Sequence, residues 1–404
     1  MTNSGVLCYN AFMNRLYTQL SNQAQELLQN EQMSKDALSF YEGKRQVAEY
    51  MFGYPSYNYA LSPLTQYLLL LHYTSPFSNN CGDIDERGNY ALDTKDMEKK
   101  IVGLYAKKFG MGDGFWGYIT SGGSESNSCG IAMAFAQNPN AILYYPQSAH
   151  YSVEKYAQHY TRMQIPTIGK DKLNYDAFFT QILKNYQTTG KAANIVLTHG
   201  TTKYGECDDI DAIVAFLREQ NIPYYLHVDA ALFGGIPNNQ LHAPVLLNAK
   251  ARGVNSVCVS LHKYVGFPDV KSVFVATQKP RGRKIAYIGQ HDTTVSGSRC
   301  IPAFALYNHV LEQTNESDPM LYKKNVDFFE NLLQSEGVPF YRAKRSNVFV
   351  FDAPSEKTCA TFQLSCFDET EGNNILAKAH AIIFPSHGEK QMTELVKALK
   401  ADLS

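Results

Sequence analysis

The fold of this chain is decided by residues 193–228, which read ANIVLTHGTTKYGECDDIDAIVAFLREQNIPYYLHV. An apolar run at 193–198 is followed by a helical pattern at 208–219 and by a second apolar run at 224–228. Short apolar runs that alternate with helical patterns are typical of a mostly parallel sheet flanked by helices. The alternation extends over residues 115–275, and we expect an α/β domain there.

Polar residues and glycines follow the predicted strands where the strands end. The carboxyl ends of parallel strands meet at one edge of a sheet, and sites in such folds form at that edge. The residues at predicted strand ends are Gly122, His150, Thr201, Asp229 and Lys263. We therefore expect these five residues to share one pocket.

A lysine and an aspartate at two of these ends favour one cofactor. Lys263 follows the buried run 253–259 and Ser260-Leu261-His262, and lysine is rarely buried unless it is paired or neutralised. A neutral lysine amine can condense with an aldehyde to form a Schiff base. Asp229 can keep a pyridine nitrogen protonated, so the pair matches pyridoxal phosphate. Alone, Lys263 would indicate a solvated side chain and Asp229 a helix N-cap.

A glycine-rich turn offers a place for the phosphate of that cofactor. Residues 117–127 read GYITSGGSESN, which predicts a strand, a turn and a helix that continues through Ala136. Glycines let the backbone approach an anion, and hydroxyls and a helix N-terminus attract it. His150 follows an apolar run at 141–145, and its flat imidazole can stack on a planar cofactor. Alone, the turn would equally indicate a tight loop and His150 a core histidine.

Taken in order, these segments resemble the group II pyridoxal-phosphate amino-acid decarboxylases, and most closely the bacterial histidine decarboxylase and plant serine decarboxylase branch. The segments that carry the resemblance are 79–83 (NNCGD), 120–127 (TSGGSESN), 150–153 (HYSV), 200–202 (GTT), 227–232 (HVDAAL), 260–263 (SLHK) and 292–299 (DTTVSGSR). They lie within residues 53–310. The chain departs from the family pattern at Leu261, at residues 266–272 and at His199.

The resemblance implies a fold-type-I enzyme, with a mostly parallel seven-stranded sheet flanked by helices and a small C-terminal α+β domain. It implies that pyridoxal 5′-phosphate is bound covalently at Lys263 and that Asp229 pairs with the pyridine nitrogen. His150 is expected to stack on the ring and to lie near the substrate carboxylate. The other implied cofactor contacts are Gly122, Gly123, Ser124, Thr201, Ser260 and His262.

The activity that the resemblance implies is α-decarboxylation of a polar L-amino acid, with histidine first and serine second. A transaminase, aldolase or carbon–sulfur lyase would use the same Lys263 and Asp229, because the cofactor supplies the electron sink. A transaminase normally needs an arginine to bind the substrate carboxylate, and Arg299 is the candidate. A third possibility is a homologue that has kept the scaffold and lost the activity.

Composition limits the class of protein. The chain has 404 residues and 45.3 kDa, with 37 basic and 38 acidic residues, so its net charge of −1 favours neither nucleic acid nor an anionic membrane as a partner. Residues 1–9 lack the pattern of a signal peptide, and residues 61–73 are too short to cross a bilayer. Eight cysteines without a Cys-x-x-Cys pair favour reduced thiols, no metal site and a cytoplasmic location.

The length predicts more than one core. We expect an N-terminal helical segment (1–52), a large cofactor-binding domain (53–310) and a small α+β domain (311–404). In the last part, helices are predicted at 303–313, 318–335 and 391–403, and strands at 339–342, 348–351 and 381–384. The resemblance implies a homodimer or a dimer of dimers, with the N-terminal segment over the partner and the loop 292–299 near its phosphate site. Apolar residues in 6–17 and 41–51 need the surface of a partner subunit to bury against.

Overall fold

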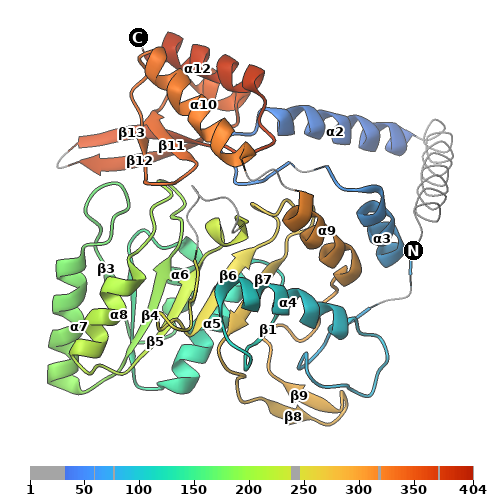
Figure 1. The fold of residues 1–404 in the computed structure, drawn as a ribbon, viewed down its shortest axis with the longest axis vertical. Helices are drawn as coiled ribbons and strands as arrows, with labels where there is room; N and C mark the ends of the chain where they lie inside the picture. Colours follow the sequence, from blue (N-terminus) through green and yellow to red (C-terminus); the bar gives the residue numbers. More distant parts are fainter. Residues whose placement is uncertain are drawn as a thin grey trace.

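The computed structural model describes residues 32–403 except 59, 76–77, 238–245, 317–319 and 372–373. The apolar segment 6–17 lies outside these residues. Figure 1 shows a large α/β domain below and a smaller C-terminal domain above it, next to the upper edge of the large sheet. The elements before the small domain are α2 (Gln32–Glu49), α3 (Pro63–Thr74), α4 (Lys95–Phe109), β1 (Trp116–Thr120), α5 (Gly123–Gln137), β2 (Ile142–Pro146), α6 (Tyr151–Ala157), β3 (Arg162–Ile165), α7 (Tyr175–Thr189), β4 (Ala193–Thr198), α8 (Ile210–Glu219), β5 (Tyr224–Asp229), the 3₁₀ turn η1 (Phe233–Gly235), β6 (Ser256–Ser260), β7 (Ser272–Ala276), β8 (Arg283–Ile285), β9 (Gln290–Asp292) and α9 (Ala303–Glu316).

The large sheet has seven strands in the order β1-β7-β6-β5-β4-β2-β3. Only β7 runs antiparallel to its two neighbours, β1 and β6, so the predicted mostly parallel seven-stranded sheet is confirmed. Strands β1, β2, β4 and β6 are buried along their whole length, as expected where helices cover both faces. This burial is why the strands appear in the sequence as continuous apolar runs.

Helix α8 shows how sequence period becomes packing. Ile210, Ile213, Val214 and Leu217 recur at helical spacing, and all four are buried in the core of the large domain. The Asp209 side chain caps the helix by accepting the N–H of Ala212 at 3.0 Å. The capped helix therefore connects β4 to β5 by the crossover that parallel strands require.

The small domain is an antiparallel sheet in the order β10-β11-β13-β12, with helices packed on it. Its elements are α10 (Leu321–Ser335), β10 (Tyr341–Arg342), β11 (Val348–Asp352), α11 (Glu356–Thr361), β12 (Ser365–Glu371), β13 (Asn374–Ile382) and α12 (Glu389–Leu403). Two of the predicted helices are found here as α10 and α12, whereas the helix expected at 303–313 is α9, which packs against α3 and α4 of the large domain. The hairpin of β12 and β13 was not predicted. The sequence analysis expected a strand at 381–384, whereas β13 ends at Ile382.

The start of the large domain is joined to the small sheet. The Phe52 and Gly53 N–H groups donate to the carbonyls of Phe362 and Gln363 at 3.1 and 2.9 Å, and Ile382 N–H donates to the Phe52 carbonyl at 2.6 Å. A Cβ on Gly53 would lie 2.1 Å from the Ser365 nitrogen, so only glycine allows this approach. We call residues 52–55 the 52–55 wall.

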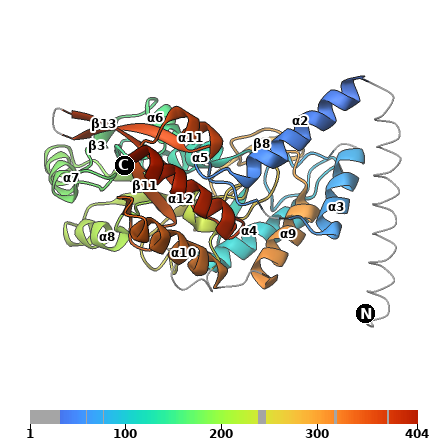
Figure 2. The same cartoon turned by 90° about the horizontal axis from the view of Figure 1, so that it is seen from above.

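Helix α2 precedes this wall and projects away from the body of the molecule (Figure 2). Its large apolar side chains are exposed, with Phe40 at 58% and Tyr41 at 66%. These apolar side chains of α2 therefore do not pack into either core of the chain.

Candidate active site

Both domains enclose a cavity of about 540 Å³ at the carboxyl ends of the parallel strands. The predicted site residues that line it are Gly122, Gly123, Ser124, His150, Asp229, Ser260, His262 and Lys263. Lys263 follows β6, Asp229 ends β5, and His150 precedes α6. Strand ends far apart in the sequence therefore form one site.

Asp229 is a buried carboxylate that the surrounding donors keep ionised. Its Oδ2 accepts a hydrogen bond from Asn127 at 2.7 Å, and its Oδ1 accepts the Ala231 N–H at 3.0 Å. Burial alone would raise the pKa of Asp229, but the Asn127 hydrogen bond, the Lys263 charge and the Ala231 N–H outweigh it. The pKa therefore lies below its usual value, and Asp229 presents a negative charge to the cavity.

Asn127 lines the cavity, and the sequence did not single it out as a site residue. Its Nδ2 donates both to Asp229 and, at 2.9 Å, to the Ser152 hydroxyl. Its Oδ1 lies 3.1 Å from His227 Nε2 and thereby has a donor of its own. Asn127 sits on the second turn of α5, so it links the glycine-rich turn, Asp229 and the α6 start. Asn127 is the last residue of the segment 120–127, but no spacing in the sequence indicates its contact with Asp229.

Lys263 carries an amine that burial pushes toward the neutral form. Desolvation lowers the pKa of Lys263, and the negative charge of Asp229 opposes that change. The Lys263 carbonyl accepts the Tyr57 N–H at 3.0 Å, which ties the segment after β6 to the chain that follows the 52–55 wall. A lysine in this state can act as a nucleophile toward an aldehyde.

His150 is held in one orientation at the N-terminus of α6. Its Nδ1 accepts the Ser152 N–H at 3.3 Å and lies 2.8 Å from the Ser152 hydroxyl. Burial lowers the pKa of His150, partly against the attraction of Asp229. The neutral ring therefore carries its proton on Nε2, since Nδ1 is used as an acceptor.

The turn before α5 has a backbone shape that leaves room for an anion. Gly122 has φ of 146°, a conformation that favours glycine, and a Cβ on Gly123 would lie 3.2 Å from the Ser260 hydroxyl oxygen. Glu125 accepts the N–H and hydroxyl of Ser121 at 2.9 and 2.6 Å, which fixes the turn. The first N–H groups of a helix have no hydrogen-bond partner within the helix. They can therefore donate to an anion that binds at this end.

Two neighbours complete that side of the cavity. The Ser260 hydroxyl lies 3.2 Å from the Ser272 hydroxyl, and His262 Nδ1 lies 3.2 Å from the Lys271 carbonyl. Because a carbonyl only accepts, Nδ1 of His262 carries the proton and its Nε2 is left for another partner. Hydroxyls, an imidazole and helix N–H groups form a donor set that suits a phosphate.

Thr201 does not line the cavity; its neighbour Thr202 does. The Thr201 hydroxyl accepts the Glu206 N–H at 3.1 Å, and its backbone pairs with the same residue. The side chain is thus used to close the turn after β4. The expectation that Thr201 lines the cofactor pocket was therefore wrong. The sequence identified the correct segment but not which of its two threonines faces the cavity.

His380 on β13 is a second residue that the sequence did not indicate. It is buried at the cavity, with Nε2 3.1 Å from the Gly53 carbonyl and Nδ1 3.1 Å from the Lys203 carbonyl. Burial lowers the pKa of His380. The ring therefore joins the small domain to the 52–55 wall and to the loop after β4.

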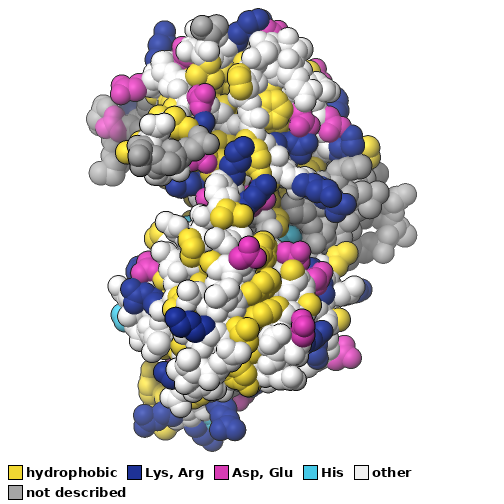
Figure 3. All heavy atoms as spheres, turned by 90° about the vertical axis from the view of Figure 1, so that its left-hand side faces the viewer, with side chains coloured by type: hydrophobic (Ala, Val, Ile, Leu, Met, Phe, Trp, Pro, Cys, Tyr) yellow, Lys and Arg dark blue, Asp and Glu magenta, His cyan; other side chains and the backbone are white. Residues whose placement is uncertain are grey.

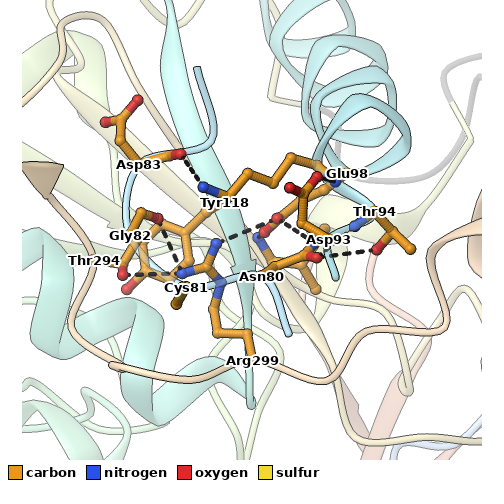
Figure 4. A network of polar contacts seen from close by, with 12 residues as sticks. Asn80, Cys81, Gly82, Asp83, Asp93, Thr94, Glu98, Tyr118, Thr294 and Arg299 are labelled. Atoms are coloured by element: carbon orange, nitrogen blue, oxygen red, sulfur yellow. Dashed lines mark hydrogen bonds and ion pairs between the residues drawn. The ribbon is translucent and has the colours of Figure 1, made fainter. Parts of the chain in front are cut away.

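Arg299 belongs to a network outside the cavity (Figure 4). Its Nη2 pairs with the fully buried Glu98 at 3.3 Å, its Nη1 donates to Thr294 at 2.9 Å, and its guanidinium stacks on Tyr118. Tyr118 in turn donates to Glu125 at 3.1 Å. Arg299 thus supports the turn indirectly, and the described residues that line the cavity include no arginine.

These groups fit pyridoxal phosphate: an amine for the aldehyde, a buried carboxylate for the ring nitrogen and a donor set for the phosphate. The fold and the site together define the fold-type-I class of pyridoxal-phosphate enzymes.

The described residues contain no group of three or more His, Cys, Asp or Glu side chains that could hold a metal ion. None of the helices described is long and apolar enough to cross a membrane. Basic and acidic side chains are interspersed on the face in Figure 3.

Comparison with known proteins gives the family. Residues 97–279 match the pyridoxal-dependent decarboxylase conserved domain. The chain is 31% identical over 371 residues to a histidine decarboxylase of Pseudomonas entomophila (strain L48), covering 85% of this chain and 84% of that protein. It is also 31% identical over 369 residues to serine decarboxylase 2 of Oryza sativa subsp. japonica, covering 87% and 74%.

Solved structures agree in fold. L-methionine decarboxylase from Streptomyces sp. 590 superposes with a TM-score of 0.76 at 19% identity, over 92% of this chain and 95% of that one. Glutamate decarboxylase of Lactobacillus brevis CGMCC 1306 gives 0.71 at 16% identity, over 92% of each. The chain belongs to the pyridoxal-dependent decarboxylase family. It is a pyridoxal-phosphate-dependent enzyme that releases carbon dioxide from an amino acid.

Proposed function

We propose that this enzyme converts L-histidine to histamine and carbon dioxide, with pyridoxal 5′-phosphate bound covalently at Lys263. The observation that carries the assignment of the site is the meeting of Lys263, Asp229 and His150 in one cavity. When bound, the cofactor supplies an aldehyde that bonds to an amine and a pyridinium ring that withdraws electrons from the breaking bond. The residues proposed for its phosphate are Gly123, Ser124, Ser260 and His262. Gly122 is a further proposed cofactor contact, and Thr202 lines the cavity where Thr201 was expected.

Three side chains have distinct roles in this proposal. The Asp229 carboxylate, ionised and fixed by Asn127, holds a proton on the ring nitrogen. His150 would lie against the ring, and its Nε2–H would be placed to orient the substrate carboxylate. The Lys263 amine, whose pKa burial lowers, would bond to the aldehyde of the cofactor. The burial of these groups strengthens each electrostatic contact relative to water.

Histidine is supported as the substrate by the histidine decarboxylase relatives, and serine is the second candidate because the rice relative is as similar. The test is to load the protein with cofactor and measure carbon dioxide release from each of the twenty amino acids. L-Histidine is expected to have the highest kcat/KM. A higher value for serine or any other amino acid would reassign the substrate, and keto-acid formation instead of carbon dioxide would indicate transamination.

Arg299 weakens the transaminase alternative. Its guanidinium is buried against Glu98 and Tyr118. A substrate carboxylate in the cavity would have to break that pair to reach it, at the cost of leaving Glu98 buried and alone.

We also propose a homodimer or a dimer of dimers, and a cytoplasmic location. The exposed apolar surface of α2 supports a partner subunit. For the domains we propose an N-terminal segment (1–52), a large domain from 53 and a small domain to 404. The boundary first expected at 310 falls inside α9, which packs against α3 and α4, and this supports a boundary after Glu316.

A further inference from the structure

Two thiols outside the cavity lie close enough to react with each other. Cys359 is on α11 and Cys366 is on β12, and their Sγ atoms are 3.0 Å apart. A disulfide bond is about 2.05 Å long, so bond formation requires an approach of about 1 Å. Cys359 is half-buried and Cys366 is exposed. Neither residue belongs to the site described above.

The pair also faces a hollow of a size that admits a small reagent. Both cysteines line an open surface hollow of about 560 Å³, together with Pro354, Gln363 and Leu364. We propose that Cys359 and Cys366 are a modification site, at which a low-molecular-weight disulfide of the glutathione class oxidises the two thiols to a reversible intramolecular disulfide. No other chemistry of the enzyme is required for this reaction.

The two thiols differ in accessibility, which sets the order of the steps. Burial raises the pKa of Cys359 to about 12, and the contact with Cys366 adds to this effect. A protonated, half-buried thiol is the poorer attacker, so Cys366 reacts first. Its thiolate attacks one sulfur of the reagent, RSSR; the S–S bond of the reagent breaks and RS⁻ leaves, taking up a proton to become RSH.

The second step closes the protein disulfide. Cys359 loses its proton, and its sulfur attacks the Cys366 sulfur of the mixed disulfide, which releases the second RS⁻ to be protonated as RSH. Two protein thiols have then been oxidised by two electrons, and RSSR has been reduced to two RSH. A thiol reductant reverses both steps.

The bond would act on the cavity through the turn that it closes. Phe362 and Gln363 lie between the two cysteines, and their carbonyls accept the N–H groups of Phe52 and Gly53. Ser365, next to Cys366, lines the cavity, as Gly53 does. Drawing α11 and β12 together therefore moves the groups that hold the 52–55 wall.

The chemistry is tested without measuring activity. Reduced full-length protein is equilibrated with mixtures of reduced and oxidised glutathione, its remaining thiols are alkylated, and its peptides are analysed by mass spectrometry. We expect the peptides of Cys359 and Cys366 to be joined, with the loss of two hydrogens. Cys366→Ser must abolish the product, whereas Cys300→Ser, at an exposed cysteine elsewhere, must leave it unchanged. The proposal would be overturned if both thiols remained reduced, and so were alkylated, at every ratio of reduced to oxidised glutathione. A product that stops at the mixed disulfide would also overturn it.

The effect on the cavity rests on the proposed function and is measured separately. We expect oxidation to lower kcat/KM for carbon dioxide release by roughly twofold or more, because small displacements near a reacting centre are costly. Dithiothreitol should restore the value, and Cys366→Ser should show no change under the same treatment. A disulfide that forms without changing kcat/KM would overturn the coupling to the wall. If no amino acid releases carbon dioxide, the proposed function fails while the peptide result still decides the disulfide.

Discussion

Asp229 carries a buried charge that asparagine would remove with little change of shape. In Asp229→Asn, cofactor should still bind, but about 2–4 kcal/mol of transition-state stabilisation should be lost, the scale found for one preorganised electrostatic group. That loss corresponds to a fall in kcat of roughly 30- to 1000-fold. Steady-state kinetics on cofactor-loaded protein measure it. Turnover near the wild-type value would exclude Asp229 as the partner of the ring nitrogen.

The two roles proposed for His150, stacking on the cofactor and binding the substrate carboxylate, can be separated by a phenylalanine. His150→Phe keeps a flat ring and should retain most cofactor affinity, while turnover falls because Nε2–H is gone. Since burial holds the pKa of His150 below its usual value, the ring of the wild type stays neutral to below about pH 6.5. The acid limb of the kcat/KM profile should lie below that pH and be absent in the variant.

Cofactor titration and kinetics distinguish the two roles of His150. If cofactor binding collapses while turnover per bound cofactor is unchanged, His150 does not face the substrate.

At the scale of elements, α5 lies so close to β5 that one position on it must be glycine. A Cβ on Gly130 would lie 2.5 Å from the His227 ring, which holds Asn127. We expect Gly130→Ala to destabilise the fold by about 1–3 kcal/mol through overpacking. Urea unfolding measures the change, with Gly103→Ala in α4 as the matched control. A Cβ there meets Phe115 at 3.6 Å, an ordinary contact, so the control should be neutral or stabilising.

Equal unfolding free energies for Gly130→Ala and the wild type would show that α5 can move away from β5 at no cost.

The connection from β4 to α8 contains a carboxyl group whose burial makes stability depend on pH. Burial raises the pKa of Asp208 to about 7, although its Oδ2 accepts the Thr198 N–H at 2.7 Å. The unfolded value is about 3.9, so between these pH values the folded state binds a proton that the unfolded state releases. The stabilisation from Asp208 is full below about pH 4 and is lost as the pH rises through 7.

The slope of this loss is on the order of 1 kcal/mol per pH unit. Asp208→Asn should flatten it, because the amide has no charge to bury and its oxygen can still accept the Thr198 N–H. Urea unfolding of both proteins at pH 5, 6, 7 and 8 measures the slopes. Identical slopes would show that Asp208 does not titrate as described.

At the scale of the whole molecule, the exposed helix α2 predicts that assembly and cofactor retention are linked. Deleting residues 1–50 removes the whole of α2 while keeping the hydrogen bonds of Phe52 and Gly53 to the small domain. We expect the deletion to weaken dimerisation and cofactor binding together, because the partner subunit would lose its contact with the apolar surface of α2. Light scattering gives the assembly state and absorbance gives the cofactor content. A stable, fully active monomer of the intact protein would overturn the proposed dimer.

Apolar runs were sufficient to predict the large sheet, since strands buried on both faces leave a direct pattern in the sequence. The strand-end residues Asp229 and Lys263 could be located for the same reason. Thr201 could not be distinguished from Thr202, because a turn hydrogen bond sets which side chain faces the cavity. Asn127 and His380 were missed because their partners come from distant elements. Strand β12 and the first part of β13 were missed because many of their residues are exposed, and only the buried end of β13 overlaps a predicted strand.

The 52–55 wall has a consequence for synthesis of the protein. His380 and Gly53 are 327 positions apart, yet they bond to each other, and Phe52 needs the carbonyl of Phe362 and the amide of Ile382. A ribosome adds about 5–20 residues per second, so Gly53 is made long before His380 and Ile382. Until those residues are made, the nascent chain carries its glycine-rich turn and Lys263 without a finished enclosure around them. A closed site around the cofactor can therefore form only after the small domain has been synthesised.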